Sequence, residues 1–375
     1  MPRFRSNSST ADHTAPWAGI VPPFIVEQLW RSGDTEIQAV ALENETLSRL
    51  CRVGRADTIT AIARAHPPHP MAGLLAIAEP RPLDRRIHDA ENRSVNFLPG
   101  RLARAEGDVE IGDLAVDEAY DYSGIVYDFF RERFERQSLD DQGMSLVSSV
   151  HVGRRFANAF WNGQQMVYGD GDGRVFLRFT GSLDVVAHEM THGVIQFTSN
   201  LVYRGESGAL NESFADVFGV LVKQWHLGQT VDEADWLVGA ELLTEAPTRR
   251  ALRSLAAPGT AYQNDPFLGS DPQPAHVRDQ YFGSADEGGV HINSGIPNHA
   301  FYLTATELGG HAYEAAAEIW YRTMLELRSR STFAECAATC AAVATRLYGA
   351  GSPEQLAVRR AWTAVGVSVS ERSLA

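Results

Sequence analysis

Residues 183–194 read LDVVAHEMTHGV and contain the motif His188-Glu189-Met190-Thr191-His192. Residues four apart on a helix share one face, so both imidazoles can reach a single ion while Glu189 lies beside it. This pattern is typical of zinc hydrolases. With 12 histidines among 375 residues, chance produces such a match only about 0.03 times. The alternative, two histidines on an ordinary surface helix, is therefore disfavoured.

A third ligand is needed, because catalytic zinc usually takes three protein side chains and leaves one position for water. A metzincin would carry a glycine and a third histidine where this chain has Ile195 and Thr198. Glu212 instead lies on a second helical pattern (211–222), and its carboxylate completes a His, His, Glu set. Asp216, one turn later on the same face, can fix a ligand imidazole.

The composition excludes several classes of protein. A length of 375 residues exceeds the roughly 100–200 of one domain, so two domains and an appendage are expected. Lys+Arg 33 against Asp+Glu 47 gives a net charge of -14, which disfavours nucleic acid and anionic membranes as partners. No run approaches the roughly 18 apolar residues of a membrane span, so we expect no membrane insertion.

The first twenty residues lack the apolar core of a secretory signal. We therefore expect the protein to be cytoplasmic at synthesis and to use, for any export, a route without a signal peptide. Pro22-Pro23 opens a helical module, and the proline-rich run at 66–70 is typical of a linker. The predicted divisions are 1–75, 76–203 and 204–375.

The patterns beyond the linker predict an α+β half followed by a mostly helical half. The first contains a helix around 114–134 and a strand-like run at 145–152. Long helical patterns then cover 300–308, 313–327, 332–347 and 353–365. The GDGDG run at 169–173 lacks the glycine and glutamate spacing of an EF-hand, so we predict a tight turn there.

Several blocks of the sequence resemble the thermolysin family of metallopeptidases and occur in that family's order. They are NAFWNGQQMVYGDGDG (158–173), LDVVAHEMTHGV (183–194), LVYRGESGALNESFADVFG (201–219), ALRS (251–254) and GGVHINSGI (288–296). The similarity runs from about residue 120 to the C-terminus. It implies a two-domain thermolysin-like fold, with a mixed α/β catalytic half and a mainly helical C-terminal half.

The resemblance also implies a role for each matching residue. The zinc ligands would be His188, His192 and Glu212, with Asp216 as their support and Glu189 as general base and proton shuttle. The oxyanion would be stabilised by Tyr203 and His291, with Asp286 orienting the imidazole. Such donors stabilise the transition state more than the substrate.

The substrate-binding groups follow from the same resemblance. The peptide backbone would be held by Asn158, the carbonyl of Ala159 and Arg253. The apolar pocket for the side chain after the cut would be formed by Phe176, Phe179, Val185, Val238 and Leu252. The expected reaction is hydrolysis of internal peptide bonds before apolar residues, by attack of zinc-bound water.

The chain departs from the family at its double calcium site. Asp184 and Asp235 match ligand positions, but Lys223 replaces a glutamate, and Leu237 and Ala240 stand where further acids would be. We expect the ammonium of Lys223 to replace the double calcium between the two aspartates. The sequence leaves open whether calcium binds elsewhere in the protein.

The sequence GIVPPFIVEQL (19–29) resembles the short propeptide of the protealysin-like subgroup. The resemblance implies a helical propeptide and linker over 1–75, removed at or near 66–84. The expected contacts with the cleft are Val21, Pro22, Pro23 and Phe24. The protein would then be a leaderless zymogen inhibited by its own propeptide. The alternative is an extension that only packs on the enzyme.

Two other functions are weighed against the endopeptidase. An aminopeptidase would share the zinc motif and the downstream glutamate, but the Gly-x-Met-Glu-Asn type of motif that holds a free amine is missing. A catalytically dead binding module is disfavoured, because every chemical position is filled.

Overall fold

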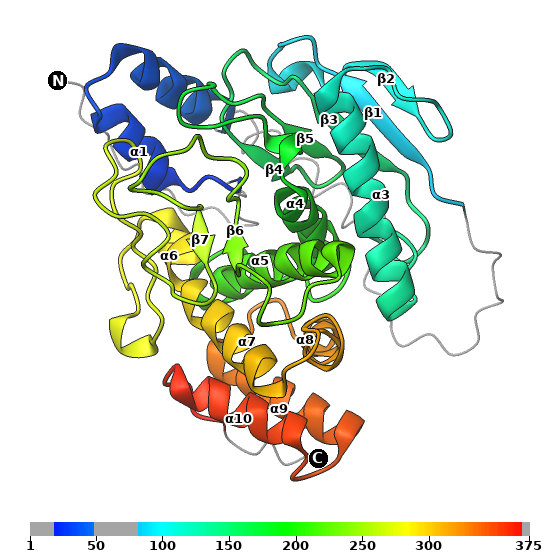
Figure 1. Cartoon of the computed structure of the whole chain (residues 1–375), viewed down its shortest axis with the longest axis vertical. Coiled ribbons are helices and arrows are strands. Elements are labelled where there is room, and N and C mark those ends of the chain that lie inside the picture. Colours follow the sequence, from blue (N-terminus) through cyan, green and yellow to red (C-terminus); the bar gives the residue numbers. More distant parts are fainter. Residues whose placement is uncertain (1–18, 49–81, 370–375) are drawn as a thin grey trace.

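The structure, a computed structural model, describes residues 19–48 and 82–369 (Figure 1). A β-sheet lies in the upper part of this view and a set of helices in the lower part, with α4 and α5 between them. The predicted α+β class is confirmed. The linker at 66–70, the processing region at 66–84 up to residue 81 and the division at 75/76 lie outside the described residues, and the division at 203/204 stays a prediction.

The sheet has five strands in the order β2-β1-β3-β5-β4. These are β1 (Arg85–Asp89), β2 (Arg101–Ala105), β3 (Leu146–Val150), β4 (Ala159–Trp161) and β5 (Met166–Tyr168). β1, β3 and β5 run parallel, whereas β2 and β4 pair antiparallel to their neighbours. β4 is an edge strand, so its free side can pair with an extended peptide.

Three long helices form the framework of the zinc motif. α3 (Leu114–Phe134) matches the predicted 114–134 and begins at Asp113, whose carboxylate accepts backbone N–H groups of the first turn. α4 (Leu183–Gln196) is buried from its first residue to Ile195, because neighbouring helices and the edge strand β4 pack against it. α5 (Gly205–Leu227) packs on α4 and ends at Gly228 in a left-handed conformation.

The helical half follows. It contains α6 (Asp286–Asn293), α7 (Gly295–Leu308), α8 (Ala315–Glu326), α9 (Phe333–Tyr348) and α10 (Pro353–Ala364). The predicted helices are confirmed to within a few residues, except that α7 begins earlier than residue 300. Pro297 lies in the first turn of α7, where a missing N–H breaks no helical hydrogen bond.

The remaining elements are short. β6 (Leu237–Val238) and β7 (Arg253–Ser254) form an antiparallel pair. The 3-10 helices are η1 (Val95–Phe97), η2 (Phe179–Gly181) and η3 (Val277–Asp279). The GDGDG run forms the predicted tight turn, because Asp172 Oδ1 accepts the backbone N–H groups of three residues that follow it.

The N-terminal residues fold against the catalytic part. α1 (Pro23–Arg31) begins at the second proline, and a further helical stretch covers residues 35–48. Ile25, Leu29 and Ile37 are fully buried within the same hydrophobic cluster as the catalytic half. This segment therefore shares a core with the enzyme rather than forming one of its own.

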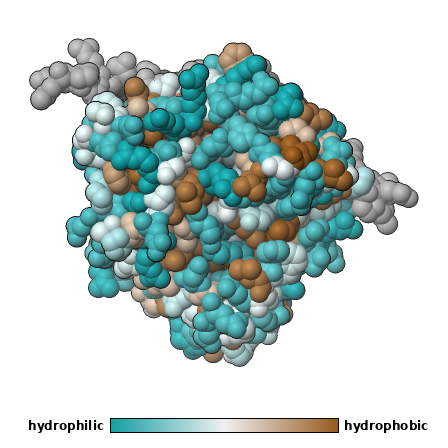
Figure 2. Space-filling model, turned by 45° about the horizontal axis from the view of Figure 1, so that its top comes forward, coloured by the Kyte–Doolittle hydropathy of each residue, from teal (hydrophilic) through white to brown (hydrophobic). Residues whose placement is uncertain are grey.

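The surface is mostly polar. On the face in Figure 2, hydrophobic residues occur in small groups between hydrophilic ones. Among the described residues, none of the helices is both long and apolar enough to cross a membrane.

Candidate metal centre and substrate cleft

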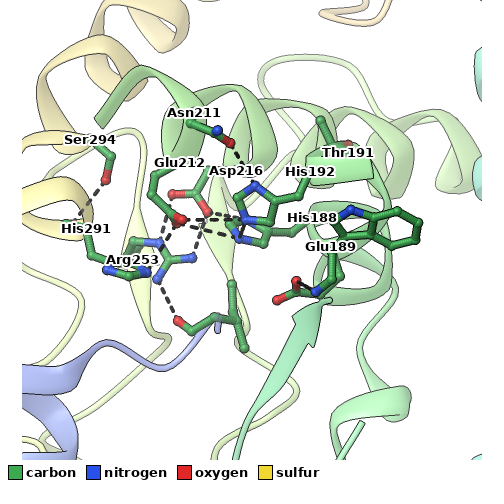
Figure 3. A network of polar contacts seen from close by, with 12 residues as sticks. His188, Glu189, Thr191, His192, Asn211, Glu212, Asp216, Arg253, His291 and Ser294 are labelled. Carbon is green, nitrogen blue, oxygen red and sulfur yellow. Dashed lines mark hydrogen bonds and ion pairs between the residues drawn. The ribbon is translucent and has the colours of Figure 1, made fainter. Parts of the chain in front are cut away.

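α4 presents the two histidines of the motif on one face (Figure 3). Their Nε2 atoms lie 3.0 Å apart, and both side chains are buried. Glu212 approaches from the facing helix α5. Its Oε2 lies 3.6 Å from His188 Nε2, and its Oε1 lies 3.5 Å from His192 Nε2. One ligand atom from each of the three residues lies within 4.8 Å of the others.

The outer ring nitrogens fix the tautomers of the histidines. His188 Nδ1 lies 2.9 Å from Asp216 Oδ1, and His192 Nδ1 lies 2.9 Å from Asn211 Oδ1. Both oxygens are acceptors, so each Nδ1 carries the proton and each Nε2 presents a lone pair.

These lone pairs face a buried carboxylate. Glu212 Oε2 has no hydrogen-bond partner among the described residues. Glu212 Oε2 and the Nε2 atom of His188 are both acceptors and lie 3.6 Å apart, so a divalent cation held between the carboxylate and the imidazoles would satisfy them. Two imidazoles and one carboxylate are a ligand set that suits zinc.

Asp216 connects the metal centre to the cleft. It is fully buried and accepts two hydrogen bonds from Arg253, at 2.8 and 2.7 Å, and one from Asn298 at 2.9 Å. Burial opposes its ionisation, but Arg253 and His188 outweigh burial and lower the pKa of Asp216. The ionised carboxylate can thus hold the ring of His188. Asn298 was not predicted from the sequence.

Glu189 lies beside the ligands and faces the edge strand. Its Oε2 accepts the backbone N–H of Trp161 at 2.7 Å, and its Oε1 is buried without a hydrogen-bond partner among the described residues. Burial, and then repulsion by Glu212, raise the pKa of Glu189 well above its usual value. A carboxylate that binds protons this readily is suited to proton transfer.

Tyr203 and His291 meet on the opposite side of the metal ligands. The Tyr203 hydroxyl donates to Glu212 Oε1 and lies 3.1 Å from His291 Nε2. Asp286 Oδ1 lies 2.7 Å from His291 Nδ1. Burial lowers the pKa of His291, but Glu212 and Asp286 outweigh it, so the net shift is upward. The structure thus brings together the residues that the sequence assigned to the oxyanion.

The turn before His291 has an unusual backbone. Asp286, Glu287, Gly288 and Gly289 all have positive φ, at 53, 51, 89 and 80°. Positive φ is uncommon for residues other than glycine. The turn brings Asp286 back onto its own helix, where Oδ2 accepts the backbone N–H of His291 at 2.8 Å.

The five residues predicted for the apolar pocket are all buried and come from separate elements. They are Phe176, Phe179, Val185, Val238 and Leu252. The rings of the two phenylalanines lie 5.9 Å apart, and the backbone of Leu252 donates to the carbonyl of Val238 at 2.9 Å. All five belong to the main hydrophobic core of the described residues.

The N-terminal segment binds the predicted backbone-holding residues through its own main chain. Ile20 N–H donates to the carbonyl of Ala159 at 3.0 Å, and the carbonyl of Ile20 accepts from Arg253 at 3.0 Å. Asn158 bonds to both the N–H and the carbonyl of Val21, at 2.9 and 3.2 Å. The sequence predicted Val21 but missed Ile20.

The other predicted cleft contacts lie further along this segment. Pro22 is buried, Pro23 is exposed, and Phe24 is half-buried against the core. The prolines have no N–H and cannot donate to the edge strand, so the paired residues precede them. A strand partner needs free N–H groups, and this requirement could have located the contact from the sequence.

A second contact that the sequence did not predict comes from the helical stretch 35–48. Asn44 is fully buried, and its Oδ1 accepts the N–H of Ala157 at 3.1 Å. Glu43 accepts the N–H of Arg154 at 2.7 Å. An asparagine on the apolar face of a helix was the available signal, because a buried amide needs a partner.

Lys223 lies among carboxylates from three segments. Its Nζ is 2.6 Å from Glu241, 3.3 Å from Asp235 and 3.9 Å from Asp184. Asp184 is fully buried, and burial raises its pKa although Lys223 opposes the shift. The sequence did not predict that Glu241 would belong to this cluster around Lys223. Lys223 is also the only lysine in the sequence.

A His-Glu-x-x-His helix, a glutamate from the facing helix and a buried tyrosine and histidine define a metallohydrolase centre. Comparison with known families is more specific. A model described as thermolysin metallopeptidase, catalytic domain, matches residues 86–196, and one described as thermolysin metallopeptidase, alpha-helical domain, matches residues 199–367. The chain belongs to the thermolysin family of metallopeptidases and is a zinc-dependent metalloendopeptidase.

Individual relatives agree with this assignment. The chain is 45% identical to the extracellular metalloprotease of Pectobacterium carotovorum subsp. carotovorum over 361 residues, or 96% of this chain and 99% of the relative. It is 49% identical to protease PrtS of Photorhabdus sp. (strain Az29), covering 77% and 78% of the two chains. Thermolysin of Alicyclobacillus acidocaldarius subsp. acidocaldarius is 40% identical, covering 75% of this chain and 50% of that one.

A solved structure extends the comparison to the N-terminal helices. The precursor of protealysin, a metalloproteinase from Serratia proteamaculans, superposes with a TM-score of 0.81 at 44% identity, covering 94% of this chain and 100% of that chain. A match of this extent to a precursor indicates that the N-terminal helices correspond to a propeptide.

Proposed function

We propose that the protein is a zinc endopeptidase whose N-terminal segment blocks the substrate cleft until that segment is removed. The observation that carries the proposal is the main-chain pairing of Ile20 and Val21 with Asn158, Ala159 and Arg253. A peptide that pairs with an edge strand through main-chain atoms binds as a substrate strand would. The same contacts explain both recognition of substrate and inhibition by the propeptide.

His188, His192 and Glu212 would hold the zinc. The ion supplies Lewis-acid activation of water and of the scissile carbonyl. Asp216 and Asn211 keep the two imidazoles in the tautomer that offers Nε2 to the metal.

Glu189 is the general base of this proposal. It takes a proton from the attacking water and returns it to the nitrogen of the leaving amine. The raised pKa of Glu189 supports this role, because the carboxylate can carry the proton between the two steps. The N–H of Trp161, which donates to this carboxylate, opposes the upward shift of the pKa without cancelling it.

Tyr203 and His291 would donate to the carbonyl oxygen as negative charge develops on it. Donors fixed in a dry site stabilise that charge without rearranging. Both side chains are buried, and Asp286 holds the imidazole from behind.

We expect the processed enzyme to cut before apolar residues such as Leu, Ile and Phe. The side chain of Ile20 is fully buried, and the five residues assigned to the pocket are buried and apolar, so they offer no partner to a charge. When a peptide library is digested, apolar residues should occur at least about ten times as often as charged residues at the position directly after the cut. Val238→Ala should enlarge the pocket and shift the preference after the cut from Leu toward Phe. Val343→Ala, the same change at a buried site on α9, should leave this preference unchanged. Charged residues dominating after the cut would contradict the assignment.

We expect Gly19→Ala to open the cleft of the precursor. A Cβ at this position would lie 2.1 Å from the carbonyl oxygen of Ala159 and 2.6 Å from Asn158 Oδ1, so the segment must shift. In the Glu189→Gln background, where self-processing is prevented, affinity for a substrate peptide should rise at least about tenfold, equivalent to 1.4 kcal/mol. Calorimetric titration of the precursor with the peptide measures this affinity.

The control for this experiment is Thr35→Ala, an exposed position on the same segment. It should leave peptide affinity unchanged. If Gly19→Ala binds peptide no better than its parent, the segment does not block the cleft through this contact. A chain starting near Leu83 gives the affinity of the open cleft.

An aminopeptidase is separated from an endopeptidase by capped substrates. We expect a peptide acetylated and amidated at its ends to be cut internally as fast as the uncapped peptide. Hydrolysis that requires a free amino terminus would overturn the endopeptidase proposal.

Because the relative from Pectobacterium is named an extracellular metalloprotease, we propose that this enzyme acts on peptides and proteins outside the cell.

Lys223 is proposed to replace the family's double calcium site. Its ammonium meets the carboxylates of Glu241 and Asp235 and lies 3.9 Å from buried Asp184. A compact ammonium fits among several carboxylates better than a planar guanidinium, which is consistent with the chain using its only lysine here.

A further inference from the structure

Gln273 reaches the backbone of His291 from a different part of the chain. It lies in the loop between β7 and η3, and its side chain is buried. Its Nε2 donates to the carbonyl oxygen of His291 at 2.8 Å and to Ser294 Oγ at 3.0 Å. Ser294 Oγ donates to the same carbonyl at 3.1 Å, a contact drawn in Figure 3.

The loop that carries Gln273 is itself fixed. Asp271 Oδ1 accepts the N–H of Gln273 at 3.0 Å, and Asp271 Oδ2 accepts the N–H groups of Gly259 and Ala261 at 3.0 and 3.2 Å. Gly295 allows a close approach from the other side, because a Cβ there would lie 2.7 Å from the carbonyl oxygen of Pro274. Gln273 is therefore a rigid support.

His291 needs such support because it lies at the very start of regular helix. The four residues from Asp286 to Gly289 are left-handed, so the regular helix begins only at Val290, one residue before His291. Asp286 holds the N–H and the Nδ1 of His291. Gln273 and Ser294 hold its carbonyl, so the histidine is fixed from both ends.

We propose that Gln273 is a positioning residue for catalysis, which orients the imidazole of His291 toward the developing oxyanion. The inference rests on the role of His291 given under the proposed function. The side chain of Gln273 bonds to the carbonyl of His291 and to Ser294, and it acts on the reaction through His291. Small displacements of a catalytic group cost about a hundredfold in rate, so loss of the support should lower kcat.

The test is a double-mutant cycle in the processed enzyme. Gln273→Leu should lower kcat about ten- to a hundredfold and change KM less than about threefold. In the His291→Ala background the same change should alter kcat less than about twofold, because the group it positions is gone. Affinity for a tetrahedral phosphonamidate peptide should fall with kcat/KM in the single variant.

Controls separate positioning from folding. Gln224→Leu removes a buried amide about 18 Å along α5 from Glu212 and should leave kcat unchanged. Zinc content and circular dichroism should match wild type in all variants, and Gln273→Met replaces Gln273→Leu if the latter does not fold. An equal loss of kcat in both backgrounds, or no loss in either, overturns the proposal. If His291→Ala itself retains wild-type kcat, the role of His291 fails, and the inference fails with it.

Discussion

Glu189→Gln is expected to lower kcat by about a thousandfold while zinc and fold are retained. The amide has nearly the same shape and can keep the hydrogen bond from the N–H of Trp161. It cannot accept a proton from water or return one to the leaving amine. The metal ligands are unchanged, so the loss should appear in kcat rather than in metal content.

This measurement uses wild type and variant freed of the N-terminal segment by the same serine peptidase, which is then inhibited. Zinc by atomic absorption and kcat on a capped peptide are determined on the same samples. Glu245→Gln, the same change at an exposed glutamate, should have wild-type activity. A Glu189→Gln enzyme with more than about a tenth of wild-type kcat would remove Glu189 from the role of base.

Lys223→Met is expected to destabilise the protein by about 3 to 5 kcal/mol, the usual cost of removing one partner of a buried ion pair. The Lys223 side chain is only 12% exposed and that of Asp184 is fully buried. Without the ammonium, Asp184 would face Glu241 and Asp235 with no counter-charge. Such a loss is a large part of a typical domain's stability.

The destabilisation should depend on pH. Burial already raises the pKa of Asp184, and loss of Lys223 should raise it further. A carboxyl with a raised folded-state pKa costs stability above that pKa and less below it, because protonation removes the buried charge. Chemical denaturation of Lys223→Met should therefore approach wild type as the pH falls through the raised pKa of Asp184, within the range where wild type stays folded.

Calcium provides the second test of this cluster. Wild type should have the same thermal midpoint with calcium and with a calcium-selective chelator. Lys223→Arg keeps the charge but not the compact shape, so we expect an intermediate loss of stability. A wild-type midpoint that falls by many degrees on chelation would mean that calcium still stabilises the fold.

The sequence alone determined the features that depend on local spacing. The interval between His188 and His192 places both on one helical face, whatever the rest of the chain does. The same periodicity located α3, α9 and α10, and α9 begins with the capping box of Thr332 and Glu335. The turn at 169–173 likewise follows from its own glycines and aspartates.

The tertiary structure decided the features that need segments far apart in the sequence. Glu241 forms an ion pair with Lys223, Asn44 accepts the N–H of Ala157, and Gln273 donates to the carbonyl of His291. These contacts exist only because the fold brings separate loops and helices together. Periodicity fixes the face on which a residue lies, but it carries no information about the partner that the face meets. The same limit explains why the sequence located the inhibitory segment at Pro22-Pro23 and included Val21 but missed Ile20, whose N–H pairs with the carbonyl of Ala159 on the edge strand.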